Sequence, residues 1–207
     1  KMKVTILIPT KNEIIGMKEI MPRIKKEWYD QLLFVDAGST DGTIEYIKKN
    51  GWDLVMQKGA GVRAAYNESY SSVKGDIIIT FSPDGNSKVE AIPLLISKMQ
   101  EGYDMVIASR YLNGAKSYDD TLMTGLANCI FTKMVSIFGY RYTDSGVMLR
   151  AYKKELQQKL GLTKIRGSFY EKHIGAYISW EPLMSIRAAK LKMKIGEIPM
   201  DEPKRIG

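Results

Sequence analysis

The sequence predicts an α/β fold in which a mostly parallel sheet carries helices on both faces. Two observations lead to this prediction: short apolar runs that suit strands buried on both faces, and charged amphipathic segments that alternate with them. The 207 residues are enough for one substantial domain, and the 44% apolar and 26% charged residues are ordinary globular values. We therefore expect a single domain over residues 1–207.

Strands and helices are expected to alternate through the first 112 residues. Continuous apolar runs predict strands at residues 4–8, 32–35, 76–81 and 104–109. A further strand should end before Gln57. Segments with charged faces predict the intervening helices at residues 13–26, 43–50, 61–73 and 90–101. This alternation is typical of Rossmann-like sheets.

Helix boundaries are signalled at two places. Asp41 or Thr43 can cap the second helix, and Gly51 follows its expected end. Ser87, with Glu90 three residues later, predicts a capping box at the start of the fourth helix.

The chain changes character after Tyr111. A polar loop at residues 113–120 leads into a long, mostly apolar segment at residues 122–138, which we expect to pack in the core. A lipid-facing groove is the alternative for its Met and Phe residues. A basic strip at residues 187–194 could rest on an anionic membrane surface or form a solvated helix face.

The net charge of +8 favours anionic partners, namely nucleic acid, a phosphorylated small molecule or an acidic membrane surface. Basic and aromatic residues do not interleave in a strip, so we expect no nucleic-acid binding. The single cysteine, Cys129, predicts a reducing, cytoplasmic setting and a buried, inert thiol. No apolar run reaches the ~18 residues of a membrane span, and we expect neither such a span nor a secretory leader.

Polar residues concentrate where the expected strands end, which is the edge where open parallel sheets bind ligands. Asp36 follows the second strand and could accept hydrogen bonds from a base edge or a ribose. Asp84 and Asn86 follow the strand at residues 76–81 and offer oxygen ligands for Mg²⁺ or Mn²⁺. The segment Ser-Pro-Asp-Gly at residues 82–85 also suits a type I turn, so Asp84 can serve a turn, a ligand or both.

Two further strand ends suit phosphate groups. Lys58 with Gly59 and Gly61 would let the backbone approach a phosphate closely beside a positive charge. Arg110, after the strand at residues 104–109, could hold a phosphate through two hydrogen bonds.

These motifs resemble family 2 glycosyltransferases of the GT-A fold, over nearly the whole chain. "IPTKNE" looks like the family's first strand end, and "VDAGSTDGT" is one residue away from the usual V-D-D-G-S-x-D-x-T. "KGAGVRAAYNESYSSVKGDIII" is similar to the segment that precedes the family's metal motif. "ASRYLNG", "DSGVMLRAYKKE" and "IGEIPM" follow in the order expected of the polyprenol-phosphate sugar transferases, the dolichyl-phosphate-mannose-synthase-like branch.

The resemblance implies a nucleotide-sugar donor and a glycosyl acceptor such as a lipid phosphate. It implies that residues 1–112 form the nucleotide-sugar-binding half and residues 113–207 the acceptor side. The nucleoside would face Pro9, Thr10, Asn12, Glu13 and Asp36. Asp84 and Asn86 would hold a divalent metal on the diphosphate, while Arg110 and Arg205 would face phosphate groups. The resemblance also implies that the protein works at the inner face of the membrane.

The chain departs from the family pattern at three places. Ser82 stands where the first Asp of an Asp-x-Asp metal motif is usual, which should weaken metal binding or shift the work to water and Asn86. Ala37 replaces a common second Asp, and "LMTGLAN" holds no basic residue where the branch usually carries an acceptor-phosphate arginine.

Transfer of the sugar with inversion, as the family implies, needs a neutralised leaving group and an acceptor in line. Asp144 is the candidate acceptor-side carboxylate: a base for an alcohol acceptor, a positioning group otherwise, or a turn residue only. A degenerate nucleotide-sugar-binding protein without turnover is an alternative. A sugar nucleotidyltransferase would carry a Gly-rich, Arg-containing loop after the first strand, which "PTKNEIIG" lacks.

Overall fold

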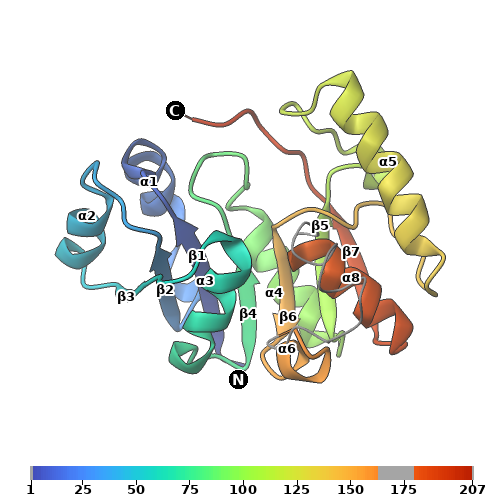
Figure 1. Cartoon of the computed structure of the whole chain (residues 1–207), viewed down its shortest axis with the longest axis horizontal. Coiled ribbons are helices and arrows are strands. Elements are labelled where there is room, and N and C mark those ends of the chain that lie inside the picture. The colour runs from blue at the N-terminus through green and yellow to red at the C-terminus, as the bar shows by residue number, and fades with distance from the viewer. Residues whose placement is uncertain (1, 163–179, 207) are drawn as a thin grey trace.

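The computed structural model describes residues 2–162 and 180–206, and within them seven strands form one sheet (Figure 1). Their order across the sheet is β3-β2-β1-β4-β6-β5-β7. The strands are β1 Val4–Thr10, β2 Gln31–Asp36, β3 Asp53–Met56, β4 Ile77–Thr80, β5 Met105–Ser109, β6 Arg150–Lys153 and β7 Ile195–Pro199. Only β6 among them runs antiparallel to its neighbours. The predicted mostly parallel sheet is confirmed.

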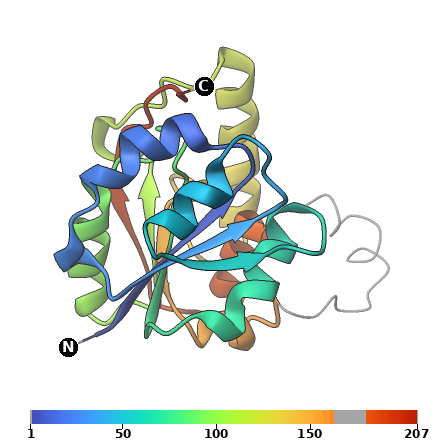
Figure 2. The same cartoon turned by 90° about the vertical axis from the view of Figure 1, so that its left-hand side faces the viewer.

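Helices cover both faces of this sheet, with α4 on one side and α3 and α8 on the other (Figures 1 and 2). The helices are α1 Ile14–Ile20, α2 Thr43–Lys49, α3 Gly61–Ser69, α4 Ala91–Gln100, α5 Leu122–Ser136, α6 Leu156–Lys159 and α8 Trp180–Lys190. Short 3₁₀ turns are η1 Met21–Arg23, η2 Lys26–Trp28, η3 Tyr70–Ser72 and η4 Leu112–Gly114. The predicted two-sided helix layer is therefore confirmed.

The central strands are buried on both faces, as their continuous apolar sequences predicted. All six residues of β2 and all four of β4 are buried. The first helix is shorter than predicted and ends at Ile20, because Pro22 has no N–H to continue the α-helical hydrogen bonds.

The two predicted helix starts have different outcomes. Asp41 precedes α2, and its carboxylate accepts hydrogen bonds from the N–H and hydroxyl of Thr43. The capping box expected at Ser87 is wrong, because α4 begins later, at Ala91. The Glu90 carboxylate instead pairs with Arg23, with 3.1 Å between Oε1 and Nη2.

The second part of the chain completes the sheet of the first part. Strand β6 lies between β4 and β5 and pairs with both, and β7 extends the sheet beside β5. Residue 112 is therefore not a packing boundary, because strands from both sides of it share one core.

The core packing expected for residues 122–138 is wrong. On α5 only Thr132 and Val135 are buried, whereas Leu122 is 97% and Ile137 81% exposed. Cys129 is also exposed, so the prediction of a buried thiol is wrong too.

The basic strip at residues 187–194 is only partly exposed. Arg187 is buried, and its Nη1 donates hydrogen bonds to the carbonyl oxygens of Leu160 and Gly161. The exposed cations of the strip are Lys190, Lys192 and Lys194.

We predict that Ile79→Ala lowers the free energy of unfolding by roughly 2–5 kcal/mol, the usual cost of removing a large buried aliphatic side chain. Ile79 lies in β4 between Ile6 of β1 and Ala151 of β6 and is fully buried. The matched control Ile15→Ala removes a side chain that is 63% exposed. Urea unfolding should show that this control lowers the free energy of unfolding by at most about 0.5 kcal/mol. Equal losses in the two variants would contradict the sheet packing.

Candidate active site

The candidate active site lies where β1 and β4 sit side by side. The chain proceeds from β1 to β2 and β3 in one direction across the sheet, and β4 lies on the other side of β1. Loops that leave adjacent strands in opposite directions open a crevice at their carboxyl ends. Two cavities, of about 570 Å³ and about 310 Å³, lie at this edge.

The larger cavity brings together six of the predicted nucleotide-binding residues: Pro9, Thr10, Glu13, Lys58, Gly59 and Gly61. They come from the ends of β1 and β3 and the start of α3. Gly61 has a φ of +81°, a conformation that side-chain-bearing residues rarely adopt. The loop is thus shaped by glycine where the sequence predicted a close backbone approach.

The Gly-rich loop already holds an anion from its own chain. The backbone N–H groups of Lys58 and Gly59 donate to the two carboxylate oxygens of Glu68, at 2.7 and 2.8 Å. These two hydrogen bonds lower the pKa of Glu68. Paired amides of this kind suit a carboxylate or a phosphate equally.

Asp36 and Asn12 organise the loops instead of lining the larger cavity. Asp36 is fully buried, and its carboxylate accepts hydrogen bonds from Thr10 Oγ1 at 2.8 Å and from Ser39 N and Oγ. Asn12 has a φ of +59°, and its Oδ1 accepts a hydrogen bond from the N–H of Thr40. Asp36, whose carboxylate was expected to face a nucleoside, therefore holds Thr10 in the wall of the larger cavity.

Asp84 stands at the corner after β4. The turn covers residues 83–86, Gly85 has a φ of +89°, and Asp84 Oδ1 accepts a hydrogen bond from the Asn86 N–H at 3.1 Å. Ser82, Asp84 and Asn86 all line the smaller cavity. The turn and ligand interpretations of Asp84 are compatible, because the turn presents the carboxylate to this cavity.

The oxygen donors at this corner fit a hard divalent cation. Asp84 supplies a carboxylate and Asn86 an amide oxygen, and Mg²⁺ commonly takes one or two carboxylates with water and substrate phosphates. Within residues 2–162 and 180–206, no cluster of three His, Cys, Asp or Glu residues is arranged to enclose a metal. A metal here would depend on water and substrate for its remaining ligands.

The C-terminal segment brings Arg205 to the same corner. Ile206 N–H donates to the Asp84 carbonyl oxygen at 2.6 Å, and Arg205 Nε lies 3.7 Å from Asp84 Oδ2. Arg205 also contacts Asp119 at 3.2 Å. Burial and the charge of Asp84 raise the pKa of the neighbouring Glu13, and Arg205 offsets part of this shift.

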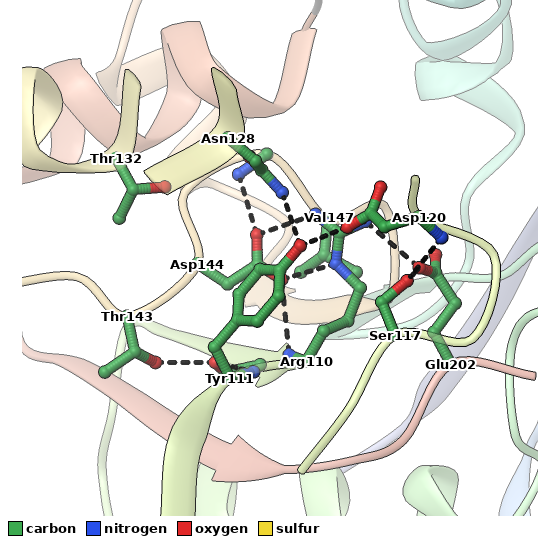
Figure 3. Close-up of polar contacts among 12 residues, drawn as sticks. Arg110, Tyr111, Ser117, Asp120, Asn128, Thr132, Thr143, Asp144, Val147 and Glu202 are labelled. Carbon is green, nitrogen blue, oxygen red and sulfur yellow. Dashed lines mark hydrogen bonds and ion pairs between the residues drawn. The ribbon is translucent and has the colours of Figure 1, made fainter. Parts of the chain in front are cut away.

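Arg110 and Asp144 form a bidentate ion pair (Figure 3). Arg110 Nε and Nη2 donate to the two oxygens of Asp144 at 2.6 and 3.0 Å, and Nη1 donates to Glu202 at 3.1 Å. Asp144 is fully buried. Burial alone would lower the pKa of Arg110, but the hydrogen bonds and charges of Asp144 and Glu202 raise it.

This pairing limits what both residues can do. The Arg110 guanidinium is expected from sequence to grip a phosphate, yet its two forked N–H groups already bind a carboxylate. Both oxygens of Asp144 are likewise engaged by Arg110, an arrangement suited to positioning rather than to accepting a proton.

Four carboxylate residues near the site escaped the sequence analysis. Glu181, Asp201 and Glu202 line the smaller cavity, and Glu197 accepts hydrogen bonds from the N–H groups of Thr143 and Asp144. Burial raises the pKa of Glu197, and those N–H groups offset part of the shift. Glu197 lies within the segment "IGEIPM" quoted for the resemblance, but it was given no role there. Glu181, Asp201 and Glu202 belong to none of the quoted motifs and come from α8 and the segment after β7.

The smaller cavity has an excess of negative charge among the residues described. Four carboxylates line it, with two guanidinium groups. The carboxylates are Asp84, Glu181, Asp201 and Glu202, and the guanidinium groups belong to Arg110 and Arg205. An additional cation would balance this lining before a phosphate enters.

A family model described as Glycosyl transferase family 2 matches residues 5–161. The chain belongs to this family. The resemblance found in the sequence is thereby confirmed. The match spans β1 to β6, which supply the lining of the larger cavity and part of the lining of the smaller one. The single histidine, His173, lies outside the described residues.

Curated relatives of this family 2 chain include undecaprenyl-phosphate 4-deoxy-4-formamido-L-arabinose transferases from Salmonella choleraesuis (strain SC-B67) and Salmonella newport (strain SL254). Each is 30% identical over 169 residues, which cover 74% of this chain and 50% of the relative. The chain therefore spans about half the length of the curated relatives it matches.

Solved structures share the fold. Glucosyl-3-phosphoglycerate synthase from Mycobacterium tuberculosis, in complex with Mn²⁺, UDP and phosphoglyceric acid, has a TM-score of 0.68 at 18% identity over 100% of this chain and 71% of that one. Its complex with Mg²⁺ and UDP also gives a TM-score of 0.68 at 18% identity, over 100% and 72% of the two chains. The GT-A fold predicted from the sequence is confirmed.

We predict that Asp144→Asn lowers the free energy of unfolding by about 3 kcal/mol, because it leaves the buried Arg110 guanidinium without its bidentate partner. The control Asp119→Asn removes a more exposed contact to Arg205 and should cost at most about 1 kcal/mol. Urea unfolding at neutral pH measures both, and a similar small cost for the two variants would contradict the importance of the buried pair.

Proposed function

We propose that this family 2 chain carries the catalytic domain of an inverting glycosyltransferase that moves a sugar from a UDP- or GDP-sugar to a polyprenyl phosphate. The observation that carries the proposal is the meeting of the two cavities. Val62, Ser82 and Met148 line both, so a donor in the larger cavity adjoins an acceptor in the smaller one.

The donor side follows from the residues around the larger cavity. Pro9, Thr10 and Glu13 would contact the nucleoside, with Asp36 holding Thr10 in place. The Lys58 ammonium group, beside Gly59 and Gly61, would contact the diphosphate, while the amides of Lys58 and Gly59 donate to Glu68. This assignment is supported by the UDP complexes of the solved structures that share the fold.

Asp84 and Asn86 would hold Mg²⁺ or Mn²⁺ at the corner after β4. Such a metal neutralises the departing diphosphate. Arg205 adds a positive charge beside Asp84 that would help to neutralise the diphosphate, but it does not replace the carboxylate ligand missing at Ser82. The carboxylate excess of the smaller cavity supports a cation requirement.

The acceptor side favours a phosphate. A phosphate nucleophile is already anionic and needs no base, and Asp144 is committed to Arg110. Arg110 and Arg205 then supply positive charge to the cavity, with Asp144 as a positioning group. The names of the Salmonella relatives support a lipid-phosphate acceptor. We propose that the transfer takes place at the inner face of the membrane.

Two alternatives are less well supported. A sugar nucleotidyltransferase would need a Gly-rich, Arg-containing loop after β1, where this chain carries "PTKNEIIG". A degenerate binding protein would bind the nucleotide without turnover. This alternative is favoured by Ser82, which stands where the first Asp of the metal motif is usual. Family membership and the paired cavities favour the transferase.

We predict that calorimetric titration finds one of UDP and GDP binding more tightly, with affinity that falls at least tenfold when EDTA replaces Mn²⁺. The reason is that Asp84 and Asn86 would hold a metal whose positive charge strengthens the binding of the diphosphate. Equal affinity in EDTA would remove the metal from the proposal. No binding of either nucleotide would remove the donor site itself.

We predict that Asp84→Asn lowers kcat for sugar transfer to a polyprenyl phosphate by roughly 10²–10³-fold, the usual cost of losing a group that stabilises transition-state charge. The matched control Asp53→Asn changes an aspartate at the opposite end of the sheet, paired with Lys74, and should leave kcat unchanged. Nucleotide binding without any transfer by the parent chain would support the binding-protein alternative.

A further inference from the structure

The exposed side of α5 is more apolar than its buried side. Along this 15-residue helix and at the residue that follows it, the side chains that face solvent include Leu122, Met123, Leu126, Ile130, Met134 and Ile137. We call this set the α5 apolar face. A helix that packs on its own domain normally turns such residues inward, so this face implies an apolar surrounding that the described residues do not provide.

The other side of α5 belongs to the candidate site. Asn128 Nδ2 donates a hydrogen bond to the Tyr111 hydroxyl, next to Arg110 (Figure 3). Thr132 and Ser145 exchange hydrogen bonds beside Asp144. The helix therefore has the acceptor-side polar cluster on one side and the apolar face on the other.

Positive charges accompany the apolar face, without negative ones. The sequence holds no Asp or Glu from residue 121 to residue 143. Lys133 and Arg141 are exposed, and Lys190 of α8 lies over the Phe138 ring at 4.5 Å. The preceding aspartates, Asp119 and Asp120, are directed toward Arg205 and Tyr111 at the site.

We propose that the α5 apolar face docks on an anionic lipid membrane, lying in its interface as an amphipathic helix. A face of aliphatic side chains with cations around it suits the boundary between acyl chains and anionic headgroups. At about 1.5 Å per residue the helix offers roughly 22 Å of contact. Figures 1 and 2 show α5 at the outside of the molecule, where such contact is sterically open.

The charge pattern favours lipid over a second copy of the chain. Two apolar faces packed together would bring Lys133 of each copy to a surface where residues 121–143 supply no carboxylate to pair with it. Like charges confined in an interface oppose association. An anionic headgroup supplies the missing negative charge.

Docking through α5 would set the candidate site at the height of the headgroups. The phosphate of a lipid acceptor would then reach Arg110 without leaving the interface. This consequence rests on the proposed function, whereas the docking itself does not.

The test is co-sedimentation with vesicles, without substrates. The parent chain should bind vesicles made of phosphatidylglycerol mixed with phosphatidylcholine. It should bind vesicles of phosphatidylcholine alone more weakly. The double variant Leu126→Gln, Ile130→Gln should bind the mixed vesicles roughly 10–100-fold more weakly, because two apolar side chains no longer enter the bilayer. The matched control Leu94→Gln, Ile15→Gln changes exposed residues of α4 and α1 and should bind like the parent.

Thermal unfolding verifies that both double variants are folded. Vesicle binding by the α5 variant equal to that of the parent overturns the proposal. The proposal is also overturned if the parent chain binds no vesicles, forms a dimer in light scattering, and loses this dimer in the α5 variant. Equal binding to both kinds of vesicle overturns the charge argument. A parent that binds vesicles through α5 but transfers no sugar supports this inference and removes the proposed function.

Discussion

The largely buried ion pair between Arg110 and Asp144 joins the parts of the chain that make the proposed acceptor side. Arg110 follows β5, Asp144 lies in the loop before β6, and the third partner, Glu202, follows β7. A charge buried without a partner is costly, so each of these segments constrains the other two. The loop at residues 144–149 that lines the smaller cavity is thus held by electrostatics as well as by packing.

The two cavities at the carboxyl edge of the sheet have different linings. On the proposed donor side, Asp36, Asn12 and Glu68 accept hydrogen bonds that fix the loops, and Lys11, Glu13 and Lys58 add charges of both signs to the cavity lining. On the proposed acceptor side, carboxylates outnumber guanidinium groups. Fixed loops with mixed charge suit a nucleoside diphosphate, and an acidic cavity suits a metal with its phosphates. Asp84 lies at the border, where a glycosyl bond would break and form.

The sequence predicted the fold and half of the site because both depend on local sequence patterns. Apolar runs mark buried strands such as β2 and β4, and the Gly-rich segment marks its loop. Asp144 was identified, but its partner Glu202 was not, since a tertiary ion pair leaves no local pattern. Residues 122–138 were placed in the core on hydrophobicity alone, although Leu122 and Ile137 face outward. Composition reports how apolar a helix is, and only its packing shows which way that face turns.

The position of β6 has a consequence for the order in which the chain can fold. Strand β6 is synthesised after β4 and β5, yet it lies between them and pairs with both. The first 149 residues thus leave β4 and β5 with unpaired edges, the kind of surface that promotes aggregation in a nascent chain. Strands β1 to β4 can pair without β6, but β5 and β7 join them only through this short late strand, which makes completion of the sheet a long-range and comparatively slow event.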